Sequence, residues 1–256
     1  MIIREQENRL IMIRQHDHAI VSGEIAAAWH PDFFFDTEKK EAVVYGVAEH
    51  DRAWIGLDET PVWNDARDLP YSFMDYPLIP KLAFYQKGVD EVAANNAYAA
   101  LLCSLHYTSF LKRAAHPAEQ QYLQHEQKRQ ASLKKALFIA SGEQESNLQF
   151  HFDLLQFSDN LSLYLCLNEP GVTKEKEHPW YREGFPQQFP FAGGKKIMAR
   201  WVDDETVSIK PFPFREELTV NLVTKQVNRE AIAKSGVAEA YRQTPETVQR
   251  VIFVRG

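Results

Sequence analysis

Five residues of the types that bind transition metals are spread along this chain. They are His18, the adjacent pair His50 and Asp51, His106, and Asp159. Imidazole nitrogen and carboxylate oxygen form a ligand set that suits Zn, Mn, Fe or Ni. Both groups are also costly to bury without a partner. We therefore expect a metal site if these side chains meet inside the fold.

Two of the five residues fall on the apolar side of a predicted helix. His106 lies within a helix expected over about 88–113, and Asp159 within one expected over 148–167. Asp has poor helix propensity and is rarely fully buried unless it is paired. An Asp on such a face therefore requires a cation or a network of hydrogen-bond donors.

The pair His50 and Asp51 ends a helix that opens at Thr37–Lys40. Neighbouring residues on a helix point about 100° apart. Both can bind one ion only if the ion lies between these two directions, near the helix end. His18 lies close to the start of another helix, for which Asp17 is the expected N-cap.

The pattern at the two ends of the chain predicts strands. Residues 2–4 and 10–14 are typical of a β-hairpin. Further strands, all expected to be antiparallel, are predicted at 195–202, 206–210, 218–223 and 248–254. A solvated helix is expected at 117–140. These elements indicate one α+β domain over 1–256, with a helical core at about 15–168 and terminal β elements at about 1–14 and 195–256.

Residues 52–85 show no clean period but are rich in aromatic residues and proline. A long loop of this kind is more often a wall or lid of a binding site than a linker. Because the loop leaves directly from His50 and Asp51, we expect Trp54 and some of Asp58, Trp63 and Phe73 to line the metal pocket.

Composition narrows the class of protein. The chain has 256 residues, 45% of them hydrophobic, and a net charge of −6. This balance is typical of an ordinary globular protein, and it offers no electrostatic case for nucleic acid or an anionic membrane as partner. Cys103 and Cys166 lie in apolar helical runs and are expected to be core residues, not a disulfide. No signal peptide or membrane span is evident, so a cytoplasmic location is expected; the oligomeric state is open.

Several segments carry a resemblance to a known superfamily. The order His, His-Asp, Asp on successive helices resembles the HD-domain superfamily of metal-dependent phosphohydrolases. More narrowly, the chain looks like a bacterial family of unassigned activity that is related to this superfamily. The similarity covers most of the chain, and its clearest segments are Gln15–Ala19, Glu49–Trp54, Ala100–Thr108, Asp159–Cys166 and Pro211–Phe214.

The resemblance implies an HD-like helical core with a small antiparallel sheet built from N- and C-terminal strands. It implies that His18, His50, Asp51 and Asp159 are ligands of one metal ion. His106 would then bind a second ion or hold a substrate phosphate. The implied activity is hydrolysis of a small phosphorylated compound by one or two ions of Mn, Fe, Zn or Ni.

One departure from the superfamily pattern keeps other reactions open. Many superfamily members follow the His-Asp pair with Gly-Lys, whereas this chain has Arg52-Ala53-Trp54. Arg52 could still supply positive charge and, with His106, stabilise charge on the departing group. Trp54 makes the site more apolar, which leaves room for a di-iron oxygenase. A non-catalytic, metal-stabilised binding protein is a third possibility.

A few other residues are candidates for supporting roles. His16 could replace His18 as a ligand, and His125 could add one. Lys112 and Arg113 follow His106 and could face an anionic substrate, although cations near a helix end also interact favourably with the helix dipole.

Overall fold

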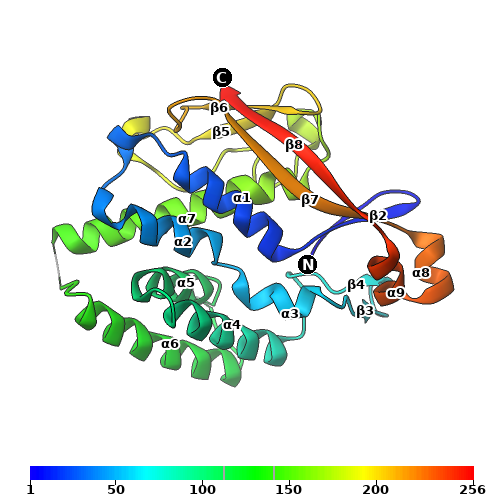
Figure 1. The fold of residues 1–256 in the computed structure, drawn as a ribbon, viewed down its shortest axis with the longest axis horizontal. Coiled ribbons are helices and arrows are strands. Elements are labelled where there is room, and N and C mark those ends of the chain that lie inside the picture. Colours follow the sequence, from blue (N-terminus) through cyan, green and yellow to red (C-terminus); the bar gives the residue numbers. More distant parts are fainter. Residues whose placement is uncertain (112, 141) are drawn as a thin grey trace.

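The structure, a computed structural model, describes residues 1–111, 113–140 and 142–256. It is an α+β fold in which a sheet lies along one side of a stack of helices (Figure 1). The α-helices are α1 (Gln15–Ala27), α2 (Lys40–Ala48), α3 (Ile55–Asp58), α4 (Leu78–Ala93), α5 (Ala97–Ser109), α6 (Pro117–Ala136), α7 (Glu143–Leu167), α8 (Arg229–Ser235) and α9 (Val237–Gln243). Short 3₁₀ helices are η1 (Pro31–Phe33), η2 (Thr37–Lys39), η3 (Arg52–Trp54), η4 (Lys174–Lys176) and η5 (Pro190–Ala192).

The main sheet has six strands in the order β1-β2-β7-β8-β6-β5. Their bounds are β1 (Ile2–Glu5), β2 (Arg9–Ile13), β5 (Met198–Trp201), β6 (Thr206–Lys210), β7 (Leu218–Asn228) and β8 (Glu246–Arg255). The predicted N-terminal hairpin is confirmed, with Ile2 opposite Ile13. Strands β3 (Trp63–Asn64) and β4 (Leu69–Pro70) form a separate small ribbon.

The sheet is larger than expected and is not wholly antiparallel. β6 pairs with β8 in parallel, with Thr206 opposite Ile252. A parallel pair needs a long connection between its strands. Here that connection runs through β7, α8 and α9, and the two helices were absent from the sequence-based prediction.

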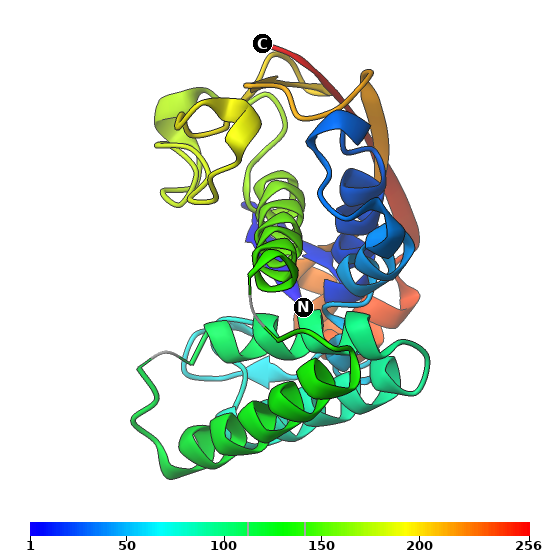
Figure 2. The same cartoon turned by 90° about the vertical axis from the view of Figure 1, so that its left-hand side faces the viewer.

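The helices that carry the candidate ligands occupy the middle of the molecule. α1 packs under β7 and beside α7, and α2 packs between α1 and α5. α4, α5 and α6 contact one another and form a layer away from the sheet (Figures 1 and 2). The candidate residues therefore lie where the helices next to the sheet meet this layer, to which α5 and His106 belong.

The prediction of a single helix over about 88–113 is wrong. The structure has two helices there, α4 and α5, separated by residues 94–96. The Asn96 side chain accepts a hydrogen bond from the Ala99 amide at 3.0 Å and so caps α5. Asn is among the best N-cap residues, and this cap explains the break.

The start of α1 also differs from the prediction. The helix begins at Gln15, and Asp17 lies in its first turn rather than at the N-cap. Arg14 donates to the Asp17 carboxylate at 2.7 Å, which holds that side chain beside the helix start. The predicted helices at 117–140 and 148–167 are confirmed as α6 and α7, and α7 starts earlier, at Glu143.

The predicted loop at 52–85 contains short regular elements. η3, α3, the β3–β4 ribbon and the first turns of α4 all lie within it. Elements of two to four residues are too short to produce a visible hydrophobic period, and for that reason the segment resembled a loop.

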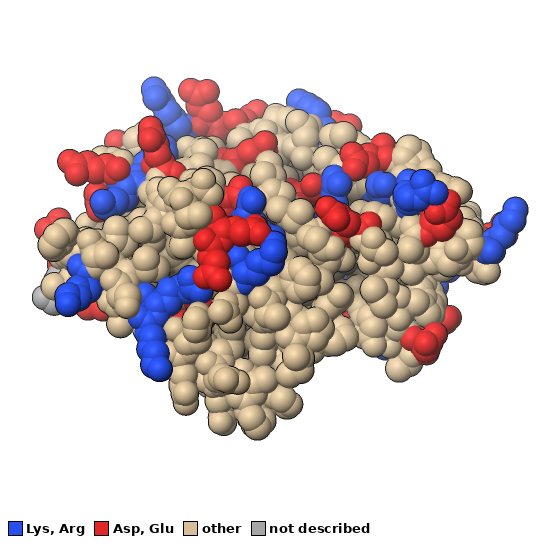
Figure 3. Space-filling model, turned by 60° about the horizontal axis from the view of Figure 1, so that its bottom comes forward, with Lys and Arg blue, Asp and Glu red and all other residues tan. Residues whose placement is uncertain are grey.

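Cys103 and Cys166 are buried and unpaired, as expected. Within the described residues, no helix has the length and apolar character needed to cross a membrane. On the face drawn in Figure 3, acidic and basic side chains are interspersed, and much of its lower part carries neither.

Candidate metal centre

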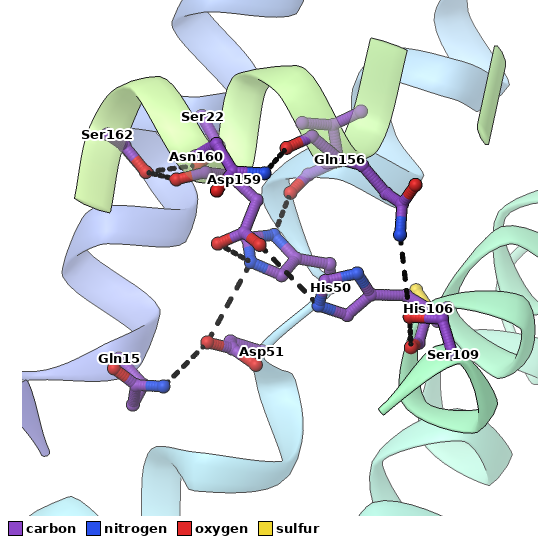
Figure 4. A network of polar contacts seen from close by, with 12 residues as sticks. Gln15, Ser22, His50, Asp51, His106, Ser109, Gln156, Asp159, Asn160 and Ser162 are labelled. Carbon is purple, nitrogen blue, oxygen red and sulfur yellow. Dashed lines mark hydrogen bonds and ion pairs between the residues drawn. The ribbon is translucent and has the colours of Figure 1, made fainter. Parts of the chain in front are cut away.

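The five candidate ligands meet at one buried point. His18 comes from α1, His50 and Asp51 follow α2, His106 is on α5, and Asp159 is on α7. Figure 4 shows the last four pointing toward one another. None of the five residues is more than 8% exposed. They form two overlapping groups that share His50, one with His18 and Asp51 and the other with His106 and Asp159.

The side chains alternate between imidazole and carboxylate. His18 Nε2 lies 2.9 Å from Asp51 Oδ2, and His50 Nε2 lies 3.7 Å from the same oxygen. On its other side, His50 Nε2 lies 3.5 Å from Asp159 Oδ1. His106 Nε2 lies 4.0 Å from Asp159 Oδ2. His50 is therefore the centre of the arrangement, with a carboxylate on each side.

His50 and Asp51 can both face inward because the helix has already ended. α2 stops at Ala48, and Asp51 has φ −109° and ψ 21°, outside helical geometry. The angle of about 100° between helical neighbours therefore does not apply to this pair. His50 is fixed by a 2.7 Å hydrogen bond from Nδ1 to the Val47 carbonyl, which directs Nε2 toward the carboxylates.

Neighbouring polar groups orient the other ligands. His18 Nδ1 lies 2.8 Å from Ser162 Oγ, which in turn contacts Ser22 Oγ at 2.7 Å. Gln15 Nε2 donates to Asp51 Oδ2 at 3.0 Å. Outer partners of this kind fix the tautomer and ring orientation of metal-binding histidines. Ser162 was missed in the sequence, although it lies one helical turn after Asp159 and so shares its face.

The residues fit a metal ion by a test that does not depend on the resemblance. His50 Nε2 is buried, yet it has no hydrogen-bond partner among the described residues, and the same holds for His106 Nδ1. A buried polar atom without a partner costs free energy. A divalent cation held by His50 Nε2 and the two carboxylates would remove this cost at His50, and the donor set is one that transition metals accept.

The charges in the metal-free centre are strongly coupled. Burial alone would lower the pKa of His50, but the charges of Asp51 and Asp159 raise it to about 9. Burial would raise the pKa of Asp51, but His50 and His18 lower it to about 2, and the Asp159 pKa is lowered in the same way. Burial and the charge on His50 lower the pKa of His106 to about 4, so His106 is neutral near pH 7.

A cavity of about 310 Å³ opens beside the centre. It reaches Asp51, His106 and Asp159, so a small molecule inside it would touch the candidate ligands. The other lining residues are Gln15, Trp54, Phe73, Met74, Lys81, Tyr85, Phe110, Gln156, Asn160, Leu163 and Trp180. Cavities of this size are typical of sites for small ligands.

The prediction that residues 52–85 line the pocket is correct for Trp54 and Phe73. Only some of Asp58, Trp63 and Phe73 were expected there, and Asp58 is not in the lining. It is buried and accepts hydrogen bonds from the backbone amide of Gln15, at 2.6 Å, and from the Met1 amino group. Asp58 therefore anchors the start of α1. Trp63 lines a different pocket, beside α8 and α9.

Arg52, expected to supply positive charge, is not among the residues that line the cavity. Its guanidinium pairs with Glu49 at 3.0 Å and with Glu91 at 2.7 Å. Among the described residues, the Lys or Arg that lines the cavity is Lys81. The sequence-based prediction did not include it. Lys81 was not recognised as a candidate because it falls in residues 52–85, which were predicted to be a loop.

The other supporting candidates lie elsewhere. His16 is half-buried and belongs to neither candidate metal group. His125 is on α6 beside Glu126 and Arg129, and Arg113 is exposed and absent from the lining. Lys112 lies outside the described residues.

Comparison with known proteins gives one match. A family model described as "Protein of unknown function (DUF3891)" matches residues 1–229, a span that includes all five candidate ligands. No curated protein and no solved structure matches the chain. Because the family model covers most of the sequence, this chain belongs to the DUF3891 family of proteins of unknown function.

Proposed function

We propose that this protein is a metal-dependent hydrolase of the HD type that acts on a small phosphorylated compound. The observation that carries the proposal is the buried convergence of three histidines and two aspartates around His50 Nε2, an atom that has no hydrogen-bond partner in the described part of the chain. The order of His18, His50-Asp51 and Asp159 on successive segments, which resembles the HD pattern, supports this reaction class.

One ion would be held by His50, Asp51 and Asp159, with His18 as a further ligand. His50 Nδ1 is used by the Val47 carbonyl, so this residue has a single nitrogen for a metal. The two overlapping groups therefore cannot each use His50 for a separate ion. A second ion would depend on His106 and Asp159, and otherwise His106 would contact the substrate. The donor set favours Mn, Fe, Zn or Ni.

When bound, a divalent ion would lower the pKa of a coordinated water and so supply a hydroxide near neutral pH. The chain itself would then position the substrate. The amides of Gln156 and Asn160 line the cavity and can donate hydrogen bonds to phosphoryl oxygens. Neutral His106 can serve as a ligand or hydrogen-bond donor at the metal. Lys81 adds a positive charge to the cavity wall, which Arg52 does not line.

A hydrolase assay with matched variants tests the proposal. The protein would be loaded separately with each ion and given a panel of phosphate monoesters in ¹⁸O-labelled water. We expect label in the released phosphate, loss of activity with chelator, and loss in Asp51→Asn. Asp153→Asn is the control, because Asp153 is on α7 but bonds to Gln149 and does not line the cavity. Hydrolysis that survives Asp51→Asn, or none with any ion, would overturn the proposal.

A di-iron oxygenase is the second candidate, and the cavity walls favour it. Trp54, Tyr85 and Phe110 line the cavity, and Arg52 is engaged by two carboxylates outside it. An apolar wall suits an oxidisable carbon substrate better than a highly charged one. Iron content with oxygen consumption would favour this reaction. The cavity beside the ligands leaves room for a substrate, as a catalytic metal site requires and a purely structural one does not.

A further inference from the structure

Three large apolar side chains are exposed at the mouth of the cavity. Met74 is 49% exposed, Phe110 56% and Trp180 51%, and all three line the cavity. They come from three distant parts of the chain: the segment before α4, the end of α5, and the segment after α7. Single exposed apolar residues are ordinary on protein surfaces. Three that share one cavity indicate a binding surface for an apolar group.

Lys81 lies in the same wall, and among the described residues no side chain pairs with its ammonium. It is half-buried, and burial lowers the pKa of its ammonium, with Asp75 and Glu119 partly opposing this effect. Both carboxylates are engaged elsewhere: Asp75 with Ser72 and Arg67, and Glu119 with the amide of His116. A half-buried cation without an ion pair, in a cavity wall, is well placed to bind an anion.

Lys81 also lies at a position on α4 where a cation lowers the stability of the helix. It lies in the first turn, where the positive end of the helix dipole disfavours a cation. An anion bound beside the first turn of α4 would interact favourably with both the ammonium and the helix end. A role for Lys81 in binding a ligand would account for this unfavourable interaction with the helix dipole.

Lys81 belongs to the outer end of the cavity. Tyr85, one turn further along the same helix, is 6% exposed and packs against Trp54 and Tyr107 deeper in the protein. The charged groups that affect the pKa of the Lys81 ammonium are Asp75 and Glu119, and neither belongs to the metal centre. The cavity thus has a metal end and a distal end of different chemistry.

We propose that the cavity mouth, formed by Met74, Lys81, Phe110 and Trp180, selects a substrate whose distal part is one flat apolar ring that carries an anionic group. The ring would lie against the apolar side chains, and the anionic group would pair with Lys81. A volume of about 310 Å³ accommodates one such ring with a phosphate at its other end, but not a dinucleotide. This inference rests on the proposed function, because it takes the phosphate to bind at the metal end.

Two non-hydrolysable probes separate the ends of the cavity. Phenylphosphonate offers a ring and a head for the metal, and 4-carboxyphenylphosphonate adds a distal carboxylate. Calorimetric titration of the metal-loaded protein should show about tenfold tighter binding of the carboxylated probe, the effect of one charge-assisted hydrogen bond. Trp180→Ala should weaken binding of both probes.

Variants of α4 test the role of Lys81. Lys81→Gln should remove the preference for the carboxylated probe and leave the affinity for phenylphosphonate unchanged, and Lys81→Arg should retain the preference. The control is Lys87→Gln, because Lys87 is on the same helix but is exposed and pairs with Glu91. A thermal melt of each variant establishes that it is folded.

The outcomes distinguish this inference from the proposed function. Equal binding of the two probes, a preference that survives Lys81→Gln, or no binding of either probe would overturn the inference. If removal of the metal leaves the affinity for phenylphosphonate unchanged, the hydrolase proposal loses its basis, although a Lys81-dependent preference could still be measured. If the metal dependence is present but the preference is absent, only the inference fails.

Discussion

His50 is the residue on which the chemistry of this centre depends. One ring nitrogen bonds to the Val47 carbonyl, and the other faces two carboxylates. In metal-free protein that nitrogen holds a proton, because Asp51 and Asp159 raise the pKa of His50 to about 9. A metal ion would take the place of the proton at the same atom, so protons and metal compete for the site.

This competition predicts that stability depends on pH differently in the metal-free and the metal-loaded protein. A folded-state pKa raised from 6.5 to about 9 stabilises metal-free protein fully below pH 6.5, and the stabilisation, on the order of 3 kcal/mol, is lost as pH rises through 9. His106, Asp51 and Asp159 keep one charge state across this window, since their folded pKa values lie below it. Chemical unfolding should therefore show decreasing stability of metal-free protein from pH 6.5 to 9 and no such loss in metal-loaded protein.

The variant His50→Gln supplies the control, because it has no proton to lose in this range. Its metal-free stability should be nearly independent of pH over the same interval. A wild-type decrease that persists in His50→Gln would mean that another group causes it.

Substitution of Asp159 tests whether this residue is a metal ligand or only a structural acid. Asp159→Asn should lose bound metal, because a neutral amide is a much poorer ligand, and should cost about 1–3 kcal/mol of stability. Asp153→Asn on the same helix should keep full metal content. Metal content and unfolding free energy would be measured for both variants. Full occupancy in Asp159→Asn would exclude Asp159 as a ligand.

At the scale of elements, close packing of backbones holds the candidate ligands His50 and Asp51 in place. An added Cβ at Gly88 on α4 would lie 2.7 Å from the Ala53 amide nitrogen, just after His50 and Asp51. On the other side, a Cβ at Gly23 on α1 would lie 2.7 Å from the Ala48 Cβ. These glycines let α1 and α4 approach the segment that carries the central ligands.

Gly88→Ala should therefore disturb the centre from a distance. The new methyl group would push against backbone atoms of Ala53, which cannot turn aside, at a cost of about 1–3 kcal/mol. Metal affinity should fall as His50 and Asp51 shift. Gly56→Ala is the matched control, because its nearest neighbour is a Phe84 ring carbon at 3.7 Å, an ordinary contact. Equal stability and metal affinity in both variants would show that this packing does not position the ligands.

The residue pattern indicated which candidate ligands come together better than it predicted the elements around them. Buried Asp159 and His106 are anomalous on apolar helix faces, so their types alone indicated a site. The break before α5 was missed although Asn96 is a strong cap signal, because apolar residues continue on both sides of it. Lys81 and Trp180 could not be predicted, since only the folded chain brings these segments together at one cavity.

At the scale of the molecule, the centre joins elements that are distant in sequence. Its five residues connect α1, the end of α2, α5 and α7, between the sheet and the outer helices. A metal bound there would link these elements in the native state and not in the unfolded chain. Metal binding should therefore add to global stability.

Chelation is expected to destabilise the whole protein. With metal in large excess over its dissociation constant, its removal should cost about 3–4 kcal/mol and lower the melting temperature by about 5–15 °C. Asp159→Asn, already without metal, should respond little to chelator. Differential scanning calorimetry with and without chelator measures both proteins. A wild-type melting temperature that does not change would mean that the ion, if bound, does not stabilise the fold.

Metal stoichiometry tests the central claim most directly. Wild-type protein, His50→Ala and the control His125→Ala would be prepared without chelators, incubated with divalent ions, freed of excess and analysed for elements. Wild type and His125→Ala should each carry about one or two ions of Mn, Fe, Zn or Ni per chain, and His50→Ala almost none, because every candidate group includes His50. Wild-type protein without stoichiometric metal after this treatment, or His50→Ala with the wild-type content, would contradict the assignment of a metal centre.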